Sequence, residues 1–196
     1  NRPLLNLLFI PNNLQILKIH EDCFSMSKSI AQRISNLTTI EYMNGLTNYV
    51  FTIPCCSNQL SKNLKNIKIM GDYSYIQEGA FSRFKSIEKV EFGLQTNISI
   101  IQKNAFLECE KLQQISIPSS CISIEEGAFK NCISLVSVHL PSNLKYIRKE
   151  SFFNCSSLES IEIPSTVLII CEGAFMNCTK LYNVEILAHE KGLELI

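Results

Sequence analysis

Nine cysteines, three histidines and two aspartates are the side chains of this 196-residue chain that are best suited to catalysis or metal binding. Zinc sites and Ser-His-Asp triads need such residues at defined spacings or in a common pocket. No Cys-x-x-Cys or Cys/His pair has zinc spacing, and His20, His139 and His189 lie far apart in the sequence. No glycine-rich phosphate loop is present. The sequence therefore predicts no metal site, no cofactor and no enzyme.

Most of the cysteines fit a structural pattern instead. Four of them recur every 23 residues: Cys109, Cys132, Cys155 and Cys178. Cysteine is small, apolar and commonly buried, so we expect a ladder of free thiols in a core, together with Cys23 and Cys121 at a second repeated position. A disulfide-bonded ladder is the alternative, but its geometry is demanding at a strand spacing of ~4.8 Å. Cys55 and Cys56 are the candidates for a reactive or bridging thiol.

The cysteines belong to a repeated unit, so repeats must position them. Phe106, Phe129, Phe152 and Phe175 keep the same period and are expected in one core layer. Each unit has an apolar anchor, and the anchors are Leu14, Leu37, Leu64, Ile87, Leu112, Leu135, Leu158 and Leu181. Two steps are longer, at 27 and 25 residues, which predicts loop insertions within 44–56 and near 93–97.

Each part of the unit has a structural interpretation. Two apolar residues separated by a single residue, such as Ile161 and Ile163, indicate a short strand with one buried face. The proline that follows ends this strand. The spacing of three in Ala-Phe-x-x-Cys-x-x-Leu fits a helical or 3₁₀ turn. Ile124, Ile147 and Ile170 mark a second inward-facing point. A coil cannot bury these side chains alone, so coils stack and their strands pair in a parallel ladder.

These features predict one solenoid domain of eight coils over residues 1–196. Regular repeats occupy 64–186, degenerate repeats 1–63, and a partial repeat or cap 187–196. Since Leu193 begins a further coil, we expect the chain to be part of a longer solenoid or to have a partner on that edge.

The segment IEEGAFKNCISLVSVHLPS (residues 124–142) and its neighbouring copies closely resemble the BspA-like leucine-rich repeats, also called the Treponema pallidum type. The resemblance is strongest over 99–186 and weakest over 1–63. Asn58, Phe84, Arg148 and Cys171 depart from the family pattern. The resemblance implies a curved, right-handed leucine-rich-repeat solenoid. It also implies a surface protein of a mucosal microbe, here with the composition of a parasitic protist.

The residues between the paired apolar positions should point outward and form the binding surface. They are Lys18, Glu41, Lys68, Glu91, Ser116, His139, Glu162 and Glu185. Tyr182, just before the last strand, is a further contact candidate. Together with Glu159, the last two glutamates make the C-terminal end acidic, which suits a basic protein partner.

The expected function is protein binding through this curved sheet, in cell-surface adhesion or attachment to host matrix. The alternative is an intracellular scaffold or regulatory subunit. Eighteen basic and eighteen acidic residues provide no net field for nucleic acid, and no apolar run reaches the ~20 residues of a membrane span. Sequons at Asn36, Asn97, Asn154 and Asn177 favour secretion only weakly. We expect Asn154 and Asn177, in the repeat turn, to cap local amides.

Overall fold

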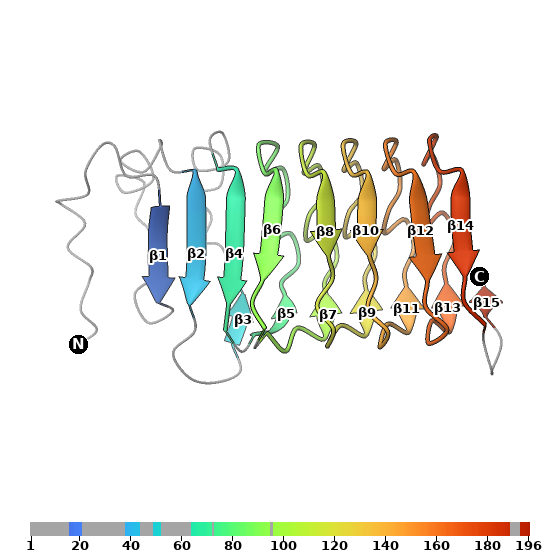
Figure 1. The fold of residues 1–196 in the computed structure, drawn as a ribbon, viewed down its shortest axis with the longest axis horizontal. Helices are drawn as coiled ribbons and strands as arrows, with labels where there is room; N and C mark the ends of the chain where they lie inside the picture. Colours follow the sequence, from blue (N-terminus) through green and yellow to red (C-terminus); the bar gives the residue numbers. More distant parts are fainter. Residues whose placement is uncertain are drawn as a thin grey trace.

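The computed structural model describes residues 16–20, 38–43, 49–51, 64–71, 73–94, 96–188 and 193–196. Within these ranges it contains two parallel sheets and no helix, and the strands stand side by side in a row (Figure 1). The front sheet has the order β1 (Ile16–His20), β2 (Thr39–Met43), β4 (Asn66–Met70), β6 (Lys89–Phe92), β8 (Gln114–Ser116), β10 (Ser137–His139), β12 (Ser160–Ile163) and β14 (Asn183–Ile186). This confirms a parallel solenoid.

The back sheet has seven strands, each contributed by the same coil as a front strand. Its order is β15 (Glu194–Leu195), β13 (Ile169–Ile170), β11 (Tyr146–Ile147), β9 (Ser123–Ile124), β7 (Ile100–Ile101), β5 (Tyr73–Ile76) and β3 (Tyr49–Phe51). The isoleucines that the sequence marked as inward-facing, such as Ile124 and Ile147, are the buried residues of these strands. The coil therefore has two strand ladders, of which the sequence predicted one.

The interior front strands alternate as expected, whereas all four residues of β14 are exposed. In β12, Ile161 and Ile163 are buried and Glu162 between them is exposed. The ladder also ends where proline was expected to end it. Gly93 N and Leu187 N each donate to the preceding coil, to Ile69 O and Ile163 O. Proline at the same repeat position lacks this donor.

A column of phenylalanine rings fills the space between the sheets. Phe81, Phe106, Phe129, Phe152 and Phe175 stack in sequence, with neighbouring ring centroids 5.0, 5.1, 5.2 and 5.3 Å apart. The first four are fully buried, which confirms the predicted core role of Phe106, Phe129 and Phe152, whereas Phe175 is only partly buried. Beside them, the thiol of each repeated cysteine donates to a phenylalanine carbonyl of the preceding coil, as Cys132 Sγ does to Phe106 O at 3.2 Å. The coil spacing is thus uniform along the column.

The turn that carries Phe and Cys has the hydrogen bonds of the expected 3₁₀ turn but forms no helix. Within the turn, some amides donate to the carbonyl three residues earlier, as Cys109 N does to Phe106 O. Alternate amides donate to the next coil instead, as Phe106 N does to Ala128 O at 2.7 Å. Two positions of each turn have a left-handed backbone. In successive coils the first position is occupied by Gly79, Asn104, Gly127, Glu150 and Gly173. The second position is occupied by Arg83, Glu108, Asn131, Asn154 and Asn177. Left-handed residues interrupt a right-handed helix, so the segment becomes a series of turns.

Asparagine also acts differently from the prediction. We expected Asn154 to cap local amides, but Asn154 Nδ2 donates to Asn131 Oδ1 at 3.0 Å, in the preceding coil. Because asparagine adopts the left-handed conformation more readily than most residues, it combines the turn geometry with a contact between coils.

Replacing Ser151 with alanine should stabilise the fold. Ser151 is fully buried at the position occupied by Ala105, Ala128 and Ala174, and its Oγ has no hydrogen-bond partner among the described residues. A buried unpaired polar group costs about 1–3 kcal/mol. We expect Ser151→Ala to raise the free energy of unfolding by about 1 kcal/mol in urea titrations. The matched change Ala128→Ser should lower the free energy of unfolding. A Ser151→Ala variant that is less stable than wild type would show that the Ser151 hydroxyl is not an unpaired buried group.

Candidate functional site

The predicted binding residues lie in one column across the front sheet. The strand registers place Lys18 beside Glu41, Glu41 beside Lys68, Lys68 beside Glu91, Ser116 beside His139, and Glu162 beside Glu185. His139, Ser116, Glu162 and Glu185 are exposed, as the period of two predicts. The side chain of Lys18 lies outside the described residues. We call the outward face of the front sheet, which contains this column, the front face.

The N-terminal half of the column pairs its own charges. Lys68 Nζ lies 3.4 Å from Glu41 Oε1 and 3.9 Å from Glu91 Oε2, and Lys89 also pairs with Glu91. Glu41 is the least exposed of these side chains, at 16%. Opposite charges in adjacent strands stabilise the sheet modestly. This half of the column is therefore less available to a charged partner than the sequence indicated.

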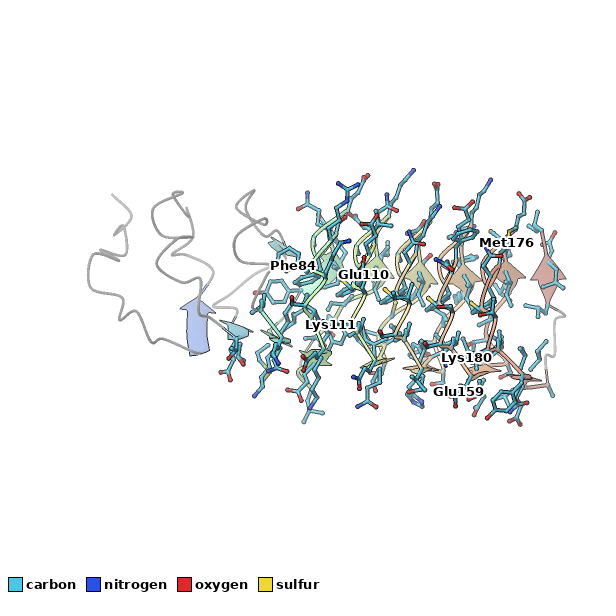
Figure 2. The ribbon with its side chains drawn as sticks, turned by 90° about the horizontal axis from the view of Figure 1, so that it is seen from above. Phe84, Glu110, Lys111, Glu159, Met176 and Lys180 are labelled. Carbon is cyan, nitrogen blue, oxygen red and sulfur yellow. The ribbon has the colours of Figure 1, made fainter. Side chains whose placement is uncertain are left out.

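The C-terminal half of the column is open and acidic. Glu159, Glu162 and Glu185 are exposed, and no ion pair involves them within the described part of the chain. Tyr182 is 80% exposed at the start of the last coil. Figure 2 shows Glu159 and Lys180 on the same side of the row of coils. An exposed tyrosine next to several carboxylates can contact a basic protein segment.

A groove of about 760 Å³ also opens on the front face, between β6 and β8. Met70 and Leu94 contribute exposed apolar side chains to its lining, and Phe92 is only partly buried there. Lys68, Lys89 and Glu91 contribute charged groups. The nearby insertion was predicted from the repeat spacing, but the groove that it shapes was not.

The groove follows from two features of the sequence. The step between the anchors Ile87 and Leu112 contains the two-residue insertion, and Pro118 has no amide hydrogen to bond to the preceding coil. β6 and β8 pair in register only at Lys89 and Gln114, as β10 and β12 do only at Ser137 and Ser160, whereas β4 and β6 pair along the whole of β6. The ladder stops early at this step, and the surface between the two strands stays open.

The buried cysteines are poorly suited to chemistry. Burial raises the pKa of Cys121 and Cys132 to about 12, and burial also raises that of Cys109. A protonated thiol is neither a good nucleophile nor a metal ligand. The six cysteines of the described region, all between 109 and 178, are free thiols, and no cluster of metal-binding side chains occurs in that region. Cys23, Cys55 and Cys56 lie outside the described residues.

The outward side of the back sheet is a surface that was not predicted from the sequence. In-register neighbours there are Tyr75, Ile100, Ser123, Tyr146 and Ile169. These strands are two to four residues long, too short for a period of two to stand out in the sequence. The signal that was available is the recurrence of Tyr or Ile immediately before an inward isoleucine.

The part of the chain that the structure describes has no helix long and apolar enough to cross a membrane. A family model described as the BspA type leucine rich repeat region, in six copies, matches residues 4–88 and 99–193. No curated protein matches the chain significantly.

The fold is similar to that of solved structures. The crystal structure of a T. pallidum leucine-rich-repeat protein matches with a TM-score of 0.66 and 24% identity, over 76% of this chain and 69% of that one. A leucine-rich-repeat protein from Bacteroides ovatus matches with a TM-score of 0.34 and 18% identity, over 93% and 74% of the two chains. A leucine rich cell surface protein from Faecalibacterium prausnitzii matches with a TM-score of 0.29 and 17% identity, over 91% of this chain and 80% of that one.

Proposed function

The chain belongs to the BspA-type leucine-rich-repeat family, and from this premise we propose that it is a protein-binding module of a cell surface, which attaches the cell to host matrix or to another cell. Leucine-rich-repeat solenoids present an extended sheet whose outward residues are free to vary, while their cores are fixed by stacking. Such proteins are generally not catalysts, and binding is the function that this architecture serves best.

The observation that carries the proposal is the contrast between the two halves of the front face. Its N-terminal half neutralises its own charges through Lys68, Glu41 and Glu91. Its C-terminal half leaves Glu162 and Glu185 exposed beside Tyr182. Unpaired surface charges of one sign accelerate association with a partner of opposite sign and contribute to specificity. We therefore place the contact with a basic protein segment at the C-terminal half.

The alternative function is an intracellular scaffold that uses the same face. It is favoured by the six free cysteines of the described region, because cysteines remain reduced in the cytosol. Buried thiols also persist outside the cell, so these residues support the alternative less strongly than the family supports adhesion. The two functions share the binding surface and differ in the partner.

Charge reversal at Glu162 and Glu185 should weaken binding without unfolding the chain. The double variant Glu162→Lys/Glu185→Lys should bind deposited epithelial matrix about tenfold more weakly at low salt, because like charges then face the basic partner. The control is Glu126→Lys/Glu172→Lys, which makes the same change in net charge at exposed turn residues. Binding is measured by biolayer interferometry, with thermal melting as the check of folding.

Two outcomes would count against the proposal. If both double variants bind equally weakly, net charge rather than the front face determines binding. If the wild-type chain binds neither matrix nor intact epithelial cells, adhesion is wrong and the intracellular scaffold takes its place.

A further inference from the structure

The in-register column on the outward side of the back sheet is more apolar than the corresponding column of the front face. Tyr75, Ile100, Tyr146 and Ile169 are partly buried at four of five consecutive in-register positions, Ser123 at the fifth is buried, and the exposed Glu194 follows Ile169. Ile122, immediately beside this column, is 39% exposed. The corresponding column of the front face contains only charged residues, serine and histidine. We call the outward side of the back sheet the back face. This apolar stripe of partly exposed side chains, interrupted at Ser123, is a candidate interaction site.

Two opposite charges border the stripe at the same position of consecutive coils. Glu125 N donates to Ile101 O and Arg148 N to Ile124 O, both at 2.9 Å, so the two residues are neighbours along the row of coils. Each side chain is held near its own coil. Ser123 Oγ donates to Glu125 Oε1 at 2.5 Å, and the Arg148 guanidinium lies 4.5 Å from the centroid of the Tyr146 ring.

We propose that the back face binds the back face of a second copy of this chain. A two-fold axis parallel to the strands, between β9 and β11, reverses the order of the coils. It places Glu125 opposite Arg148 of the partner subunit, and Ile100 opposite Ile169 of the partner subunit. The pattern of charges and apolar residues is thus complementary to itself, which a two-fold dimer requires. Two sheets packed in this way lie about 10 Å apart with their strands within about 30°.

This dimer is independent of the proposed function. The front and back faces belong to different sheets, so the dimer leaves both front faces exposed. It would double the number of front faces on one particle, and two linked sites bind a surface much more tightly than one. Loss of the dimer would leave each single front face intact, so failure of one proposal does not affect the other.

The test is a pair of charge reversals studied separately and mixed. The wild-type chain, under reducing conditions, should show a concentration-dependent monomer–dimer equilibrium in sedimentation velocity. Glu125→Arg and Arg148→Glu should each weaken the dimer at least tenfold, because like charges then meet across the axis. An equimolar mixture of the two variants should dimerise again, since every charge in the mixed dimer faces an opposite one. Glu126→Arg, on the adjacent turn, is the control and should dimerise like wild type.

The mixture separates the dimer contact from effects within one chain. Each reversal also places like charges in neighbouring coils of the same chain, and thermal melting reports that cost. If either variant fails to fold, Ile100→Ser tests the apolar contact instead and should weaken the dimer comparably. A wild-type chain that stays monomeric up to millimolar concentration, reversals without effect, or a mixture that stays monomeric would each overturn the proposal.

Discussion

Replacing Phe152 with alanine should lower the free energy of unfolding by about 3–5 kcal/mol. The Phe152 ring is fully buried, with Phe129 at 5.2 Å on one side and Phe175 at 5.3 Å on the other. Its removal leaves a cavity between three successive coils, and the uniform strand ladders prevent the coils from closing it. Urea unfolding followed by circular dichroism measures the loss.

The matched control is Phe175→Ala, in the next coil. Phe175 is only partly buried and, among the described residues, stacks on Phe152 alone. Its replacement should therefore cost clearly less than that of Phe152. Equal losses in the two variants, or no loss in Phe152→Ala, would contradict the assignment of the phenylalanines to one core column.

Alkaline pH should destabilise the fold through its buried thiols. Burial raises the pKa of Cys132 from 9.0 to about 12, and that of Cys121 likewise. Between these values the unfolded chain releases a proton that the folded chain keeps, so the free energy of unfolding falls as pH rises. Each thiol contributes about 1.4 kcal/mol per pH unit, or about 4 kcal/mol over the whole interval. Below pH 9 the thiols are protonated in both states and contribute no pH dependence.

The variant Cys132→Ala isolates one of these thiols. Its free energy of unfolding should fall less steeply above pH 9 than that of wild type, by about 1.4 kcal/mol per pH unit. The other titratable groups are the same in both proteins, so the difference between the two slopes reports Cys132 together with its effect on the pKa of Cys109 and Cys155. Urea titrations with a phosphine reductant measure it. Identical slopes would show that solvent reaches Cys132 in the folded chain.

The front ladder and the phenylalanine column could be predicted because they repeat in residue type as well as position. Ile161 and Ile163, with Glu162 between them, give a period of two that is typical of a strand with one buried face. The left-handed turn positions could not be predicted in the same way. Arg83, Glu108 and Glu150 occupy them where the remaining coils have asparagine or glycine, and hydrogen bonds to the next coil hold their backbones there.

The surfaces were harder to predict than the core. The outward direction of Glu162 and His139 follows from alternation, but the pairing of Lys68 with Glu41 depends on register between coils separated by an insertion. The groove depends on how β6 pairs with β8, and the back face on strands as short as Ser123–Ile124. These surface features depend on contacts between neighbouring coils, whereas a repeat pattern in the sequence describes the residues of a single coil.

The hydrogen bonds of both ladders, and those of alternate amides in the turns, run between adjacent coils along the row. A tensile force applied along the row therefore loads the coil interfaces in series, and each interface bears the full force. The weakest interface yields first while the others keep their length. Each coil of 23 residues that unravels lengthens the chain by roughly 75 Å. A molecule built in this way extends in steps under load, and each step dissipates work before the next interface yields.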